Sequence, residues 1–392
     1  MSERTIAAVA TPPGEGSVGV IRISGEKAAE IADSVFFAVS GKPLSALKGY
    51  SAAYGEIRDG DTVIDDAVAL VFKAPKSYTG EDVVEISVHG GALILRDTLR
   101  LLYKKGAFPA EPGEFTKRAF LNGKTDLARA ESIMGLISAK NESQLRLSRA
   151  AHLGKISEKI DGIISRLTSA DAAIAVYSDY PDEEIEGLDR ESFLSSLKAC
   201  AQDIEQMLLT YNAGRVLREG IETVIVGKPN VGKSTLMNML SGAERSIVTE
   251  VAGTTRDVIE DTVNVGDIML RLADTAGIRD TDDRVESIGV ELAKKRIELA
   301  DLVLAVFDIT KPLDNDDKKL LELVKHKNTV VILNKSDMGS NADISAFAGF
   351  RTVVTSAVNG GGYDALCSTI ADIAGTAGLD PESAVLINER QR

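Results

Sequence analysis

Cysteine and histidine are scarce in the 392-residue chain, which contains two cysteines and three histidines. Cys200 and Cys367 are too few and too far apart to form a disulfide framework or a cysteine-based metal site. His89, His152 and His326 show no HExxH or similar spacing that would indicate a zinc centre. These absences argue against a zinc enzyme and fit a reducing compartment.

Long hydrophobic runs are also missing. No apolar stretch approaches the roughly 18 residues that a membrane-spanning helix requires. The N-terminal sequence MSERTIAAVATPPGEG lacks the basic region and the long apolar segment of a secretory signal. We therefore expect a cytoplasmic protein without a membrane partner.

Positive charge is in deficit, because 45 lysines and arginines face 59 acidic residues and give a formal net charge of −14. Tight, unassisted binding to nucleic acid needs a basic surface. The small basic clusters at 104–105, 117–118 and 294–296 are more simply explained as solvated helix faces. We expect any contact with RNA to be local or supplied by a partner protein.

The chain is long enough for two or three domains and is 44% hydrophobic. Residues 1–118 combine short β-rich runs with helical stretches around 26–38 and 91–105, which predicts an α+β domain. Residues 119–217 lose the β signals and adopt helical spacing. The sequence therefore predicts an α+β N-terminal domain followed by a helical domain.

Two apolar stripes mark long amphipathic helices in the helical domain. One stripe extends from Leu153 to Ile174 and the other from Leu194 to Tyr211, on either side of an acidic break at 181–184. We expect residues 376–392 to start the second half of this domain with a charged helix near Asp380-Pro381-Glu382. We also expect a segment beyond Arg392 to complete the bundle.

Residues 218–375 alternate strand and helix patterns, which predicts a doubly wound parallel sheet inserted into the helical domain. The predicted elements lie at 221–226, 233–241, 268–273, 286–299, 302–308, 314–326, 329–333, 352–355 and 363–374. The overall fold class is thus α/β multidomain, and the inserted domain is of the Ras-like type.

Residues 227–234 read GKPNVGKS and directly follow the apolar run 224–226. A strand, a glycine-rich loop and a helix start in this order form a phosphate cradle, because glycine lets the backbone N–H groups turn inward. Lys233 would reach the β and γ phosphates, and the Ser234 hydroxyl would ligate Mg²⁺. The other predicted nucleotide contacts from this segment are Asn230, Val231, Gly232 and Thr235.

Two motifs after the cradle address the γ phosphate. The sequence GTTRD at 253–257 supplies Thr254 and a switch threonine, Thr255, that would complete the Mg²⁺ shell. A strand then leads into the sequence DTAG, which would place an acid near the metal and a flexible glycine under the γ phosphate. The residues of this second motif are Asp274, Thr275, Ala276 and Gly277.

Two later motifs address the base. Asn334-Lys335-Ser336-Asp337 follows a strand, and the Asp337 carboxylate can accept two hydrogen bonds from guanine that adenine cannot supply. Ser356-Ala357 follows the next strand and is placed to touch guanine O6 through a backbone N–H. All these motifs in the right order predict a GTPase domain.

The residues alone leave more than one interpretation of the catalytic groups. Ras-type enzymes orient the attacking water with a glutamine directly after the DTAG motif, whereas this chain has Ile278. Glu286 is a candidate for that role, but an acid that begins a helix also stabilises the helix dipole. No arginine finger is identifiable. Asn230 could help to ligate a monovalent cation, and a plain loop hydrogen bond explains it equally well.

The motifs resemble those of one family, the tRNA-modifying GTPases called MnmE or TrmE, over nearly the whole chain. In the N-terminal domain the resemblance rests on ATPPG at 10–14, GVIRISG at 19–25, TGED at 79–82 with Glu85, HGG at 89–91, PGEF at 112–115 and RAFLN at 118–122. It continues through residues 179–185 and the motifs GKPNVGKS, GTTRD and DTAG.

This resemblance implies cofactors and site residues. It implies that the N-terminal domain binds 5-formyltetrahydrofolate or a related one-carbon tetrahydrofolate at Arg22, Glu85 and Lys124. It implies a Mg²⁺- and K⁺-dependent GTPase, with Glu286 as the water-orienting acid in a catalytic set completed by Lys233, Thr255 and Gly277. The K⁺ ligands would be Asn230, Thr249, Val251 and Thr254.

The resemblance also implies partners and a reaction. The protein would form a homodimer whose two G domains pair across the cation site. With the FAD-dependent partner MnmG it would add an aminomethyl or carboxymethylaminomethyl group to C5 of the wobble uridine of tRNA. Family members usually end in a short cysteine-containing motif, which the sequence up to Arg392 does not contain.

Other functions fit parts of the sequence. An assembly factor resembling the Era-type ribosome-associated GTPases would use the N-terminal domain only to dimerise. A P-loop kinase would use ATP and show little preference for guanine. Residues 14–19 fit the pattern GxGxxG, but a strand follows where a dinucleotide site needs a helix, so NAD or FAD binding is not expected there.

Overall fold

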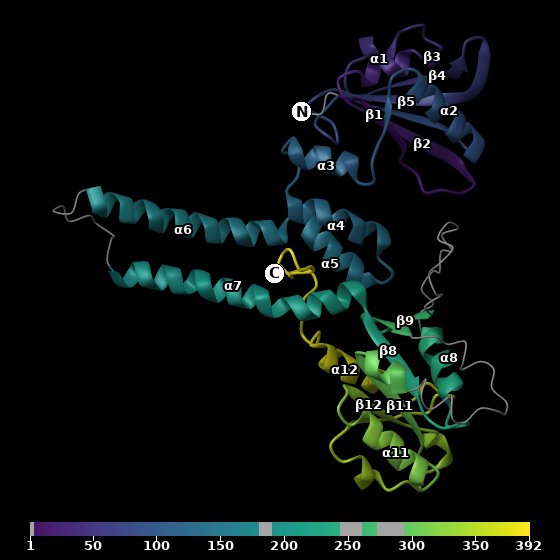
Figure 1. Cartoon of the computed structure of the whole chain (residues 1–392), viewed down its shortest axis with the longest axis vertical. Helices are drawn as coiled ribbons and strands as arrows, with labels where there is room; N and C mark the ends of the chain where they lie inside the picture. Colours follow the sequence, from purple (N-terminus) through teal and green to yellow (C-terminus); the bar gives the residue numbers. More distant parts are fainter. Residues whose placement is uncertain (1–3, 180–189, 244–260, 273–293) are drawn as a thin grey trace. The chain divides into compact units, whose positions relative to one another are not determined.

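The computed structural model describes residues 4–179, 190–243, 261–272 and 294–392 of the chain (Figure 1). The chain divides into two compact units, of which the first extends to Ala130 and the second begins at Glu131. Among the described residues, no helix combines the length and the apolar character needed to cross a membrane. The division into three domains, with boundaries at 118, 217 and 375, stays a prediction.

A seven-stranded sheet in the order β3-β4-β5-β6-β2-β1-β7 forms the first unit. All neighbouring strands are antiparallel except β1 and β7, which are parallel. The strands are β1 (Ile6–Val9), β2 (Gly16–Ser24), β3 (Phe36–Ala38), β4 (Ser51–Asp59), β5 (Thr62–Phe72), β6 (Val83–Gly90) and β7 (Phe108–Pro109).

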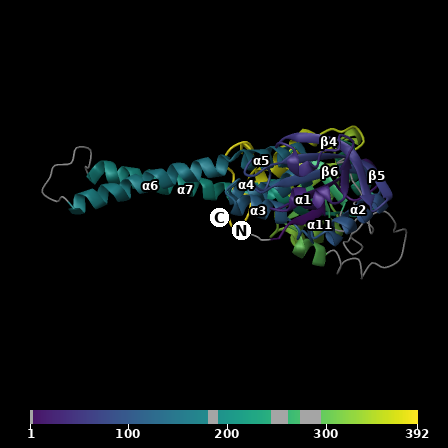
Figure 2. The same ribbon diagram turned by 90° about the horizontal axis from the view of Figure 1, so that it is seen from above.

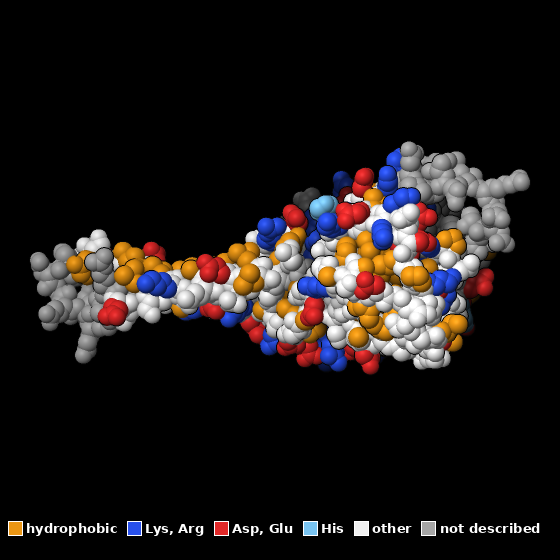
Figure 3. Space-filling view, turned by 90° about the horizontal axis from the view of Figure 1, so that it is seen from below, with side chains coloured by type: hydrophobic (Ala, Val, Ile, Leu, Met, Phe, Trp, Pro, Cys, Tyr) orange, Lys and Arg blue, Asp and Glu red, His pale blue; other side chains and the backbone are white. Residues whose placement is uncertain are grey.

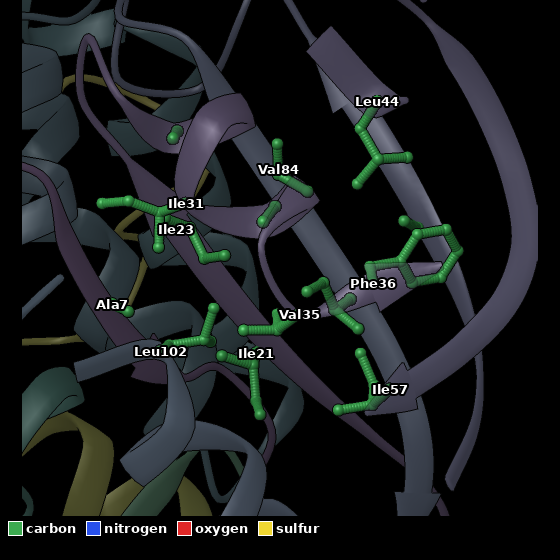
Figure 4. Close-up of a cluster of buried hydrophobic side chains, with 14 of the residues drawn as sticks. Ala7, Ile21, Ile23, Ile31, Val35, Phe36, Leu44, Ile57, Val84 and Leu102 are labelled. Carbon is green, nitrogen blue, oxygen red and sulfur yellow. The ribbon is translucent and has the colours of Figure 1, made fainter. Parts of the chain in front are cut away.

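The core of this unit lies between the sheet and two helices, α1 (Ala28–Asp33) and α2 (Ala92–Lys104). Successive strand residues face opposite sides of a sheet, so β5 buries Ala67, Ala69 and Val71 and leaves Val68 and Leu70 exposed. Figure 4 shows the buried side chains of the sheet gathered with those of the helices, among them Ile21, Ile23, Ile31, Val84 and Leu102.

The predicted α+β class of this unit is confirmed, but α1 is shorter than expected, and β3, β4 and the two-residue β7 were not predicted. The helix expected over 26–38 ends at Asp33, and residues 36–38 form β3 instead. Strand β4 was not predicted, because its sequence SAAYGEIRD has little β-branched character. The pairing of β4 with β5 supplies what the local sequence does not. A short 3₁₀ helix, η1 (Leu44–Ala46), lies between β3 and β4.

Helices follow the sheet. They are α3 (Glu114–Leu121), α4 (Leu127–Ser138), α5 (Glu142–Leu153), α6 (Lys155–Asp179) and α7 (Arg190–Glu219). The two long helices α6 and α7 are as predicted and lie side by side in both views (Figure 1 and Figure 2). Leu153, expected in the first long helix, ends α5 instead, because Gly154 takes a left-handed φ of 92° and caps that helix.

The apolar stripes of α6 and α7 are partly exposed. Ile156 and Ile163 are buried, whereas Ile160, Leu167 and Ile174 are exposed. Figure 3 shows hydrophobic side chains at the surface along these two helices. The stripe is therefore wider than the contact that α6 and α7 make with each other.

The second sheet has six strands in the order β13-β12-β11-β8-β10-β9, all parallel except the edge strand β9. This confirms the predicted doubly wound sheet; only β9 was not predicted. The strands are β8 (Ile221–Val226), β9 (Asp261–Val265), β10 (Ile268–Leu272), β11 (Leu302–Asp308), β12 (Thr329–Asn334) and β13 (Arg351–Val354). The helices are α8 (Lys233–Ala243), α11 (Asn315–Val324) and α12 (Tyr363–Ala374), with 3₁₀ turns η2 (Ser336–Met338) and η3 (Ile344–Phe347).

The expected helix near 380–382 is wrong, since residues 376–392 contain no helix. The Asp380 carboxylate accepts a hydrogen bond from the Glu382 N–H at 3.0 Å, which forms a local turn in place of a helix. Val385, Leu386 and Ile387 are buried. The Leu386 N–H donates to Thr210 Oγ1 on α7 at 3.1 Å, so the segment docks in extended form.

Candidate functional site

The sequence GKPNVGKS forms the loop between β8 and α8, at the carboxyl end of a central strand. Gly227 and Gly232 have φ angles of 154° and 97°, and Asn230 adopts a left-handed φ of 63°. A Cβ atom at Gly227 would meet the Val306 carbonyl, and one at Gly232 would meet the Asn334 amide. Glycine is therefore required at both positions by conformation and by space.

Lys233 starts α8, and its side chain turns back over the loop. Its ammonium donates to the carbonyl oxygens of Gly227 and Lys228, both at 2.7 Å. Burial lowers the pKa of Lys233 below its ordinary value of 10.5. An anion bound in the loop would favour the charged form again, which is the environment that a phosphate-binding lysine needs.

Asn334 joins the phosphate loop to the base-recognition segment. Its Nδ2 donates to the Val231 carbonyl at 3.0 Å, and its Oδ1 accepts from the Ala357 N–H at 3.0 Å and from Thr355 Oγ1 at 3.3 Å. Asn334 is buried, so these hydrogen bonds satisfy its amide inside the protein. The Ala357 N–H, one of the two backbone donors in the predicted Ser356-Ala357 contact with guanine O6, thus faces Asn334 in this structure.

Lys335 makes a second link to the loop. Its ammonium donates to the Asn230 carbonyl at 2.7 Å and pairs with Asp308 Oδ2 at 2.7 Å. Burial opposes ionisation of Asp308, but hydrogen bonds from Lys335 and Thr310 outweigh it and lower the pKa of the carboxyl. The sequence analysis did not single out Asp308, although its place at the end of β11 matches the strand ends that carry the other motifs.

Asp337 lies exposed on η2, with one carboxylate oxygen held in place. Ser356 Oγ donates to Asp337 Oδ1 at 2.7 Å. This hydrogen bond to Oδ1 fixes the orientation of the Asp337 carboxylate and leaves Oδ2 available to accept a hydrogen bond from guanine. The hydroxyl of Ser356 was not part of the prediction, which assigned this residue for its backbone.

The donor chemistry around the loop fits hard cations. Ser234 begins α8 beside Lys233 with its side chain exposed, and a hydroxyl oxygen is a ligand that Mg²⁺ accepts together with phosphate oxygens and water. The exposed Asn230 offers an amide oxygen of the kind that alkali cations accept. In the described part of the chain, no three His, Cys, Asp or Glu side chains cluster as a metal site of their own. Thr235 follows Ser234 on α8.

Several predicted residues lie outside the described residues. Their roles in the Mg²⁺ shell, the K⁺ site and water orientation stay predictions. They are Thr249, Val251, Thr254, Thr255, Asp274, Thr275, Ala276, Gly277 and Glu286.

The residues predicted for folate lie in the first unit. Arg22 on β2 and Glu85 on β6 are direct cross-strand partners, and Arg22 Nε lies 2.7 Å from Glu85 Oε1. The Arg22 guanidinium carbon lies 4.9 Å from the ring centre of Tyr78 and 5.5 Å from that of Phe115. The sheet register therefore brings Arg22 and Glu85 together, and two aromatic rings hold the arginine.

Lys124 follows α3 in the chain, and its side chain contacts the loop that precedes β6. Its ammonium donates to the Pro75 carbonyl at 3.1 Å, and a Cβ atom at Gly80 would lie 3.2 Å from its Cγ. Because Tyr78 belongs to the same loop, Lys124 and Arg22 contact neighbouring parts of one segment. A ligand shared by Lys124 and Arg22 would therefore lie along this loop.

A buried ion cluster supports that loop. Arg118 on α3 is 3% exposed and pairs with Glu81 at 3.0 Å and Glu114 at 2.8 Å. Glu81 also accepts from Ser24 Oγ at 2.8 Å. Arg118 is thus an internal charge, in contrast to the solvated helix face expected from the sequence, and it fixes the loop against β2 and α3.

Comparisons with known proteins give a consistent result. The family described as "GTP-binding protein TrmE N-terminus" matches residues 5–124, and the "MnmE helical domain" matches residues 127–392. The "tRNA modification GTPase MnmE" of Clostridioides difficile (strain 630) is 46% identical over 334 residues, which cover 85% of this chain and 73% of the relative. The protein of the same description from Listeria welshimeri is 42% identical over 389 residues, which cover 98% of this chain and 85% of the relative.

Solved structures match over a smaller part. The cytosolic domain of the T. maritima FeoB iron transporter in its GMPPNP form is 24% identical and covers 39% of this chain and 63% of that chain, with a TM-score of 0.30. That likeness carries no conclusion about function.

Proposed function

The chain belongs to the MnmE family of tRNA modification GTPases, and from this membership we propose that its GTP hydrolysis serves C5 modification of the wobble uridine of tRNA. The chain is a GTP hydrolase that uses a divalent cation. The observation that carries the proposal is the set of hydrogen bonds by which Asn334 and Lys335, of the guanine-recognition motif, hold the Val231 and Asn230 carbonyls of the phosphate loop.

These hydrogen bonds make one preorganised site from segments about a hundred residues apart in the chain. A trans peptide directs its N–H opposite to its carbonyl, so tying the Asn230 and Val231 carbonyls outward turns the N–H groups of Val231 and Gly232 inward. Inward N–H groups and the Lys233 ammonium would bind the phosphates. Asp337, oriented by Ser356, would accept from the base and exclude adenine.

Two cations belong to this proposal. Ser234 would ligate Mg²⁺ together with Thr255, and Asn230 with the loop 249–254 would ligate K⁺. The cations, when bound, neutralise charge on the phosphates, the work that an arginine finger does in other GTPases. We expect Glu286 to orient the attacking water.

The first unit would serve as the folate-binding and dimerising part. Arg22, Glu85 and Lys124 supply two cations and one carboxylate, which suits a ligand with both acidic groups and N–H donors. The sheet face away from α1 and α2 exposes Tyr54, Val68 and Leu70, apolar side chains that a second copy of the chain would cover. This surface supports a homodimer.

The full reaction would need further partners. We expect an FAD-dependent partner, MnmG, to form a hetero-oligomer with the dimer. The net charge of −14 favours contact with tRNA mainly through that complex. GTP hydrolysis would change the pairing of the two G domains and so drive the modification cycle.

Turnover in K⁺ against Na⁺ tests the nucleotide part. We expect GTP turnover to fall by about a thousandfold in Na⁺, the scale of an arginine finger's contribution. With GDP and aluminium fluoride, we expect the two G domains of the dimer to pair in K⁺ and to stay unpaired in Na⁺. Equal rates in the two salts would contradict the cation site while leaving the GTPase assignment intact.

Titration with 5-formyltetrahydrofolate tests the first unit. Specific binding by the wild-type chain that is lost in Arg22→Ala is the expected result. The variant Arg58→Ala is the control, since Arg58 also pairs with a carboxylate on this sheet, Glu56, but its guanidinium lies over the ring of Phe37. Equal folate affinity of the Arg22 and Arg58 variants would remove folate from the proposal.

A further inference from the structure

Two acidic residues lie against the phosphate loop. Asp314 is the N-cap of α11 and Asp317 is its third residue, and the two form a reciprocal capping box. A cavity of about 190 Å³ is lined on one side by loop residues 228–231 and on the other by residues that include Asp314 and Asp317. Two negative charges thus lie beside a loop whose proposed ligand carries several.

Lys228, the second residue of the loop, reaches both acids. Its ammonium hydrogen-bonds to Asp314 Oδ2 and lies 3.3 Å from Asp317 Oδ2. The side chains of Asp317, Lys228 and Asp314 are 12%, 33% and 55% exposed, so water screens the pair of Lys228 with Asp317 less than its pair with Asp314. The loop therefore carries, in its own sequence, the cation that neutralises the acids behind it.

The capping box alone does not need this lysine. The Asp314 side chain already accepts from the N–H groups of Asp316 and Asp317, and Asp317 Oδ2 accepts from the Asp314 N–H at 3.1 Å. Asparagine caps a helix about as well as aspartate does, so the cap has no requirement for negative charge. The ion pairs of Lys228 therefore add a function beyond helix capping.

We propose that Lys228 is a positioning residue that neutralises Asp314 and Asp317 toward the nucleotide and thereby sets the affinity of the phosphate loop for GTP. The inference rests on the GTP site proposed above. Without the ammonium, the two carboxylates would repel the phosphates, and the repulsion would grow with the number of phosphate charges. Lys228 contacts no reacting atom in this scheme, so it should affect binding far more than the chemical step.

The test is the affinity for a fluorescent GTP analogue and for its GDP counterpart, together with KM and kcat. We expect Lys228→Met to weaken GTP analogue binding about tenfold, and GDP analogue binding less, with kcat at saturation within about twofold. Lys228→Arg should stay near wild type, because the guanidinium can pair with both carboxylates. The control is Lys319→Met, which removes the same charge from α11 but from an exposed pair with Asp316 at 2.9 Å.

The decisive variant adds Asp314→Asn and Asp317→Asn to Lys228→Met. The triple variant keeps the cap and lacks all three charges, so we expect it to regain most of the lost GTP affinity. A loss of affinity that persists in the triple variant, or a Lys228→Met variant that binds as Lys319→Met does, would overturn the proposal. A purely structural role of Lys228 predicts that persistence, since a broken contact is not restored by deleting its partners.

Melting temperatures of all variants separate affinity from folding. If Lys228→Met does not fold, the double variant Asp314→Asn with Asp317→Asn, which keeps Lys228, tests the same proposal. Freed from its partners, the ammonium should raise GTP analogue affinity several-fold. Unchanged or weaker binding by that double variant would overturn the proposal. A wild-type chain that binds no GTP would instead refute the nucleotide site itself.

Discussion

The two predicted ligand sites are built in different ways. At the phosphate loop, three side chains tie down backbone carbonyls, one from the loop's own Lys233 and two from the distant segment Asn334-Lys335, so the ligand meets N–H groups in fixed directions. At Arg22, neighbouring strands and two aromatic rings hold side chains, and those side chains themselves would meet the ligand. The first site is a property of the backbone and the second a property of the sheet surface.

The largest effect is expected for Lys233→Ala. The variant loses the ammonium that reaches the phosphates, and GTP affinity should fall by about a thousandfold or more. Isothermal titration calorimetry measures this loss, with Lys325→Ala, at the C-cap of α11, as an exposed lysine control. Folate binding by the same variant should be unchanged, because Lys233 lies in the other unit. Micromolar GTP affinity in Lys233→Ala would contradict the geometry of the loop.

Arg118→Met should destabilise the first unit by about 3 kcal/mol or more, because it leaves Glu81 and Glu114 without their buried partner. Urea denaturation followed by a probe in this unit measures the change. The neighbouring Lys117 is exposed, and Lys117→Met should change the free energy of unfolding by less than about 0.5 kcal/mol. GTP affinity that falls together with the stability of Arg118→Met would show that the two sites are not independent.

Asp337→Asn should weaken GTP binding about a hundredfold, since two hydrogen bonds to a charged acceptor are lost. ATP affinity should stay low and unchanged. Ser356→Ala keeps the carboxylate and removes only its orienting hydrogen bond, so its effect should be several-fold smaller. Competition between GTP and ATP for a fluorescent analogue measures both variants. Intact GTP affinity in Asp337→Asn would favour an ATP-using P-loop enzyme.

The smallest effect concerns His89, which is exposed at the end of β6. The hydrogen bond that His89 Nδ1 donates to Asp65 Oδ1 at 2.7 Å and the charge of Asp65 raise the pKa of His89 above its ordinary value of 6.5. The contribution of this pair to stability is therefore complete below the unfolded-state pKa and is lost as pH rises through the folded-state pKa.

NMR titration of the His89 ring measures that pKa. Asp65→Asn should return the pKa to its ordinary range, whereas Asp66→Asn should lower it only slightly, because Asp66 acts through charge alone. Equal shifts in the two variants would assign the effect to the general negative charge of β5. GTP and folate affinities serve as controls that the surface change leaves both sites intact.

Prediction from sequence succeeded where local chemistry decides the structure. GKPNVGKS specified its loop, because glycine at 227 and 232 permits φ angles that other residues avoid. Arg22 and Glu85 lie 63 positions apart in the chain, and nothing local relates them; only the resemblance to a family pointed to both. Their cross-strand pairing became visible only when the sheet register was known.

The errors have the same origin. The segment 380–382 carries acids that favour a helix start, but burial of Val385, Leu386 and Ile387 against α7 draws the chain into an extended path. Strand β4 has little strand propensity of its own and forms because β5 pairs with it. In each case a contact with a distant segment is stronger than the local preference.

The sequence by itself determined the GTPase motifs, the alternation of strand and helix in 218–375 and the two long helices, since each depends on spacing along a few turns of chain. Only the tertiary structure decided that Lys228 faces Asp314 and Asp317, that Lys335 pairs with Asp308 and that Arg118 is buried. Charged side chains carry no period that reveals a partner far along the chain. Their pairing is decided when folding brings the carboxyl ends of parallel strands, or neighbouring antiparallel strands, to one place.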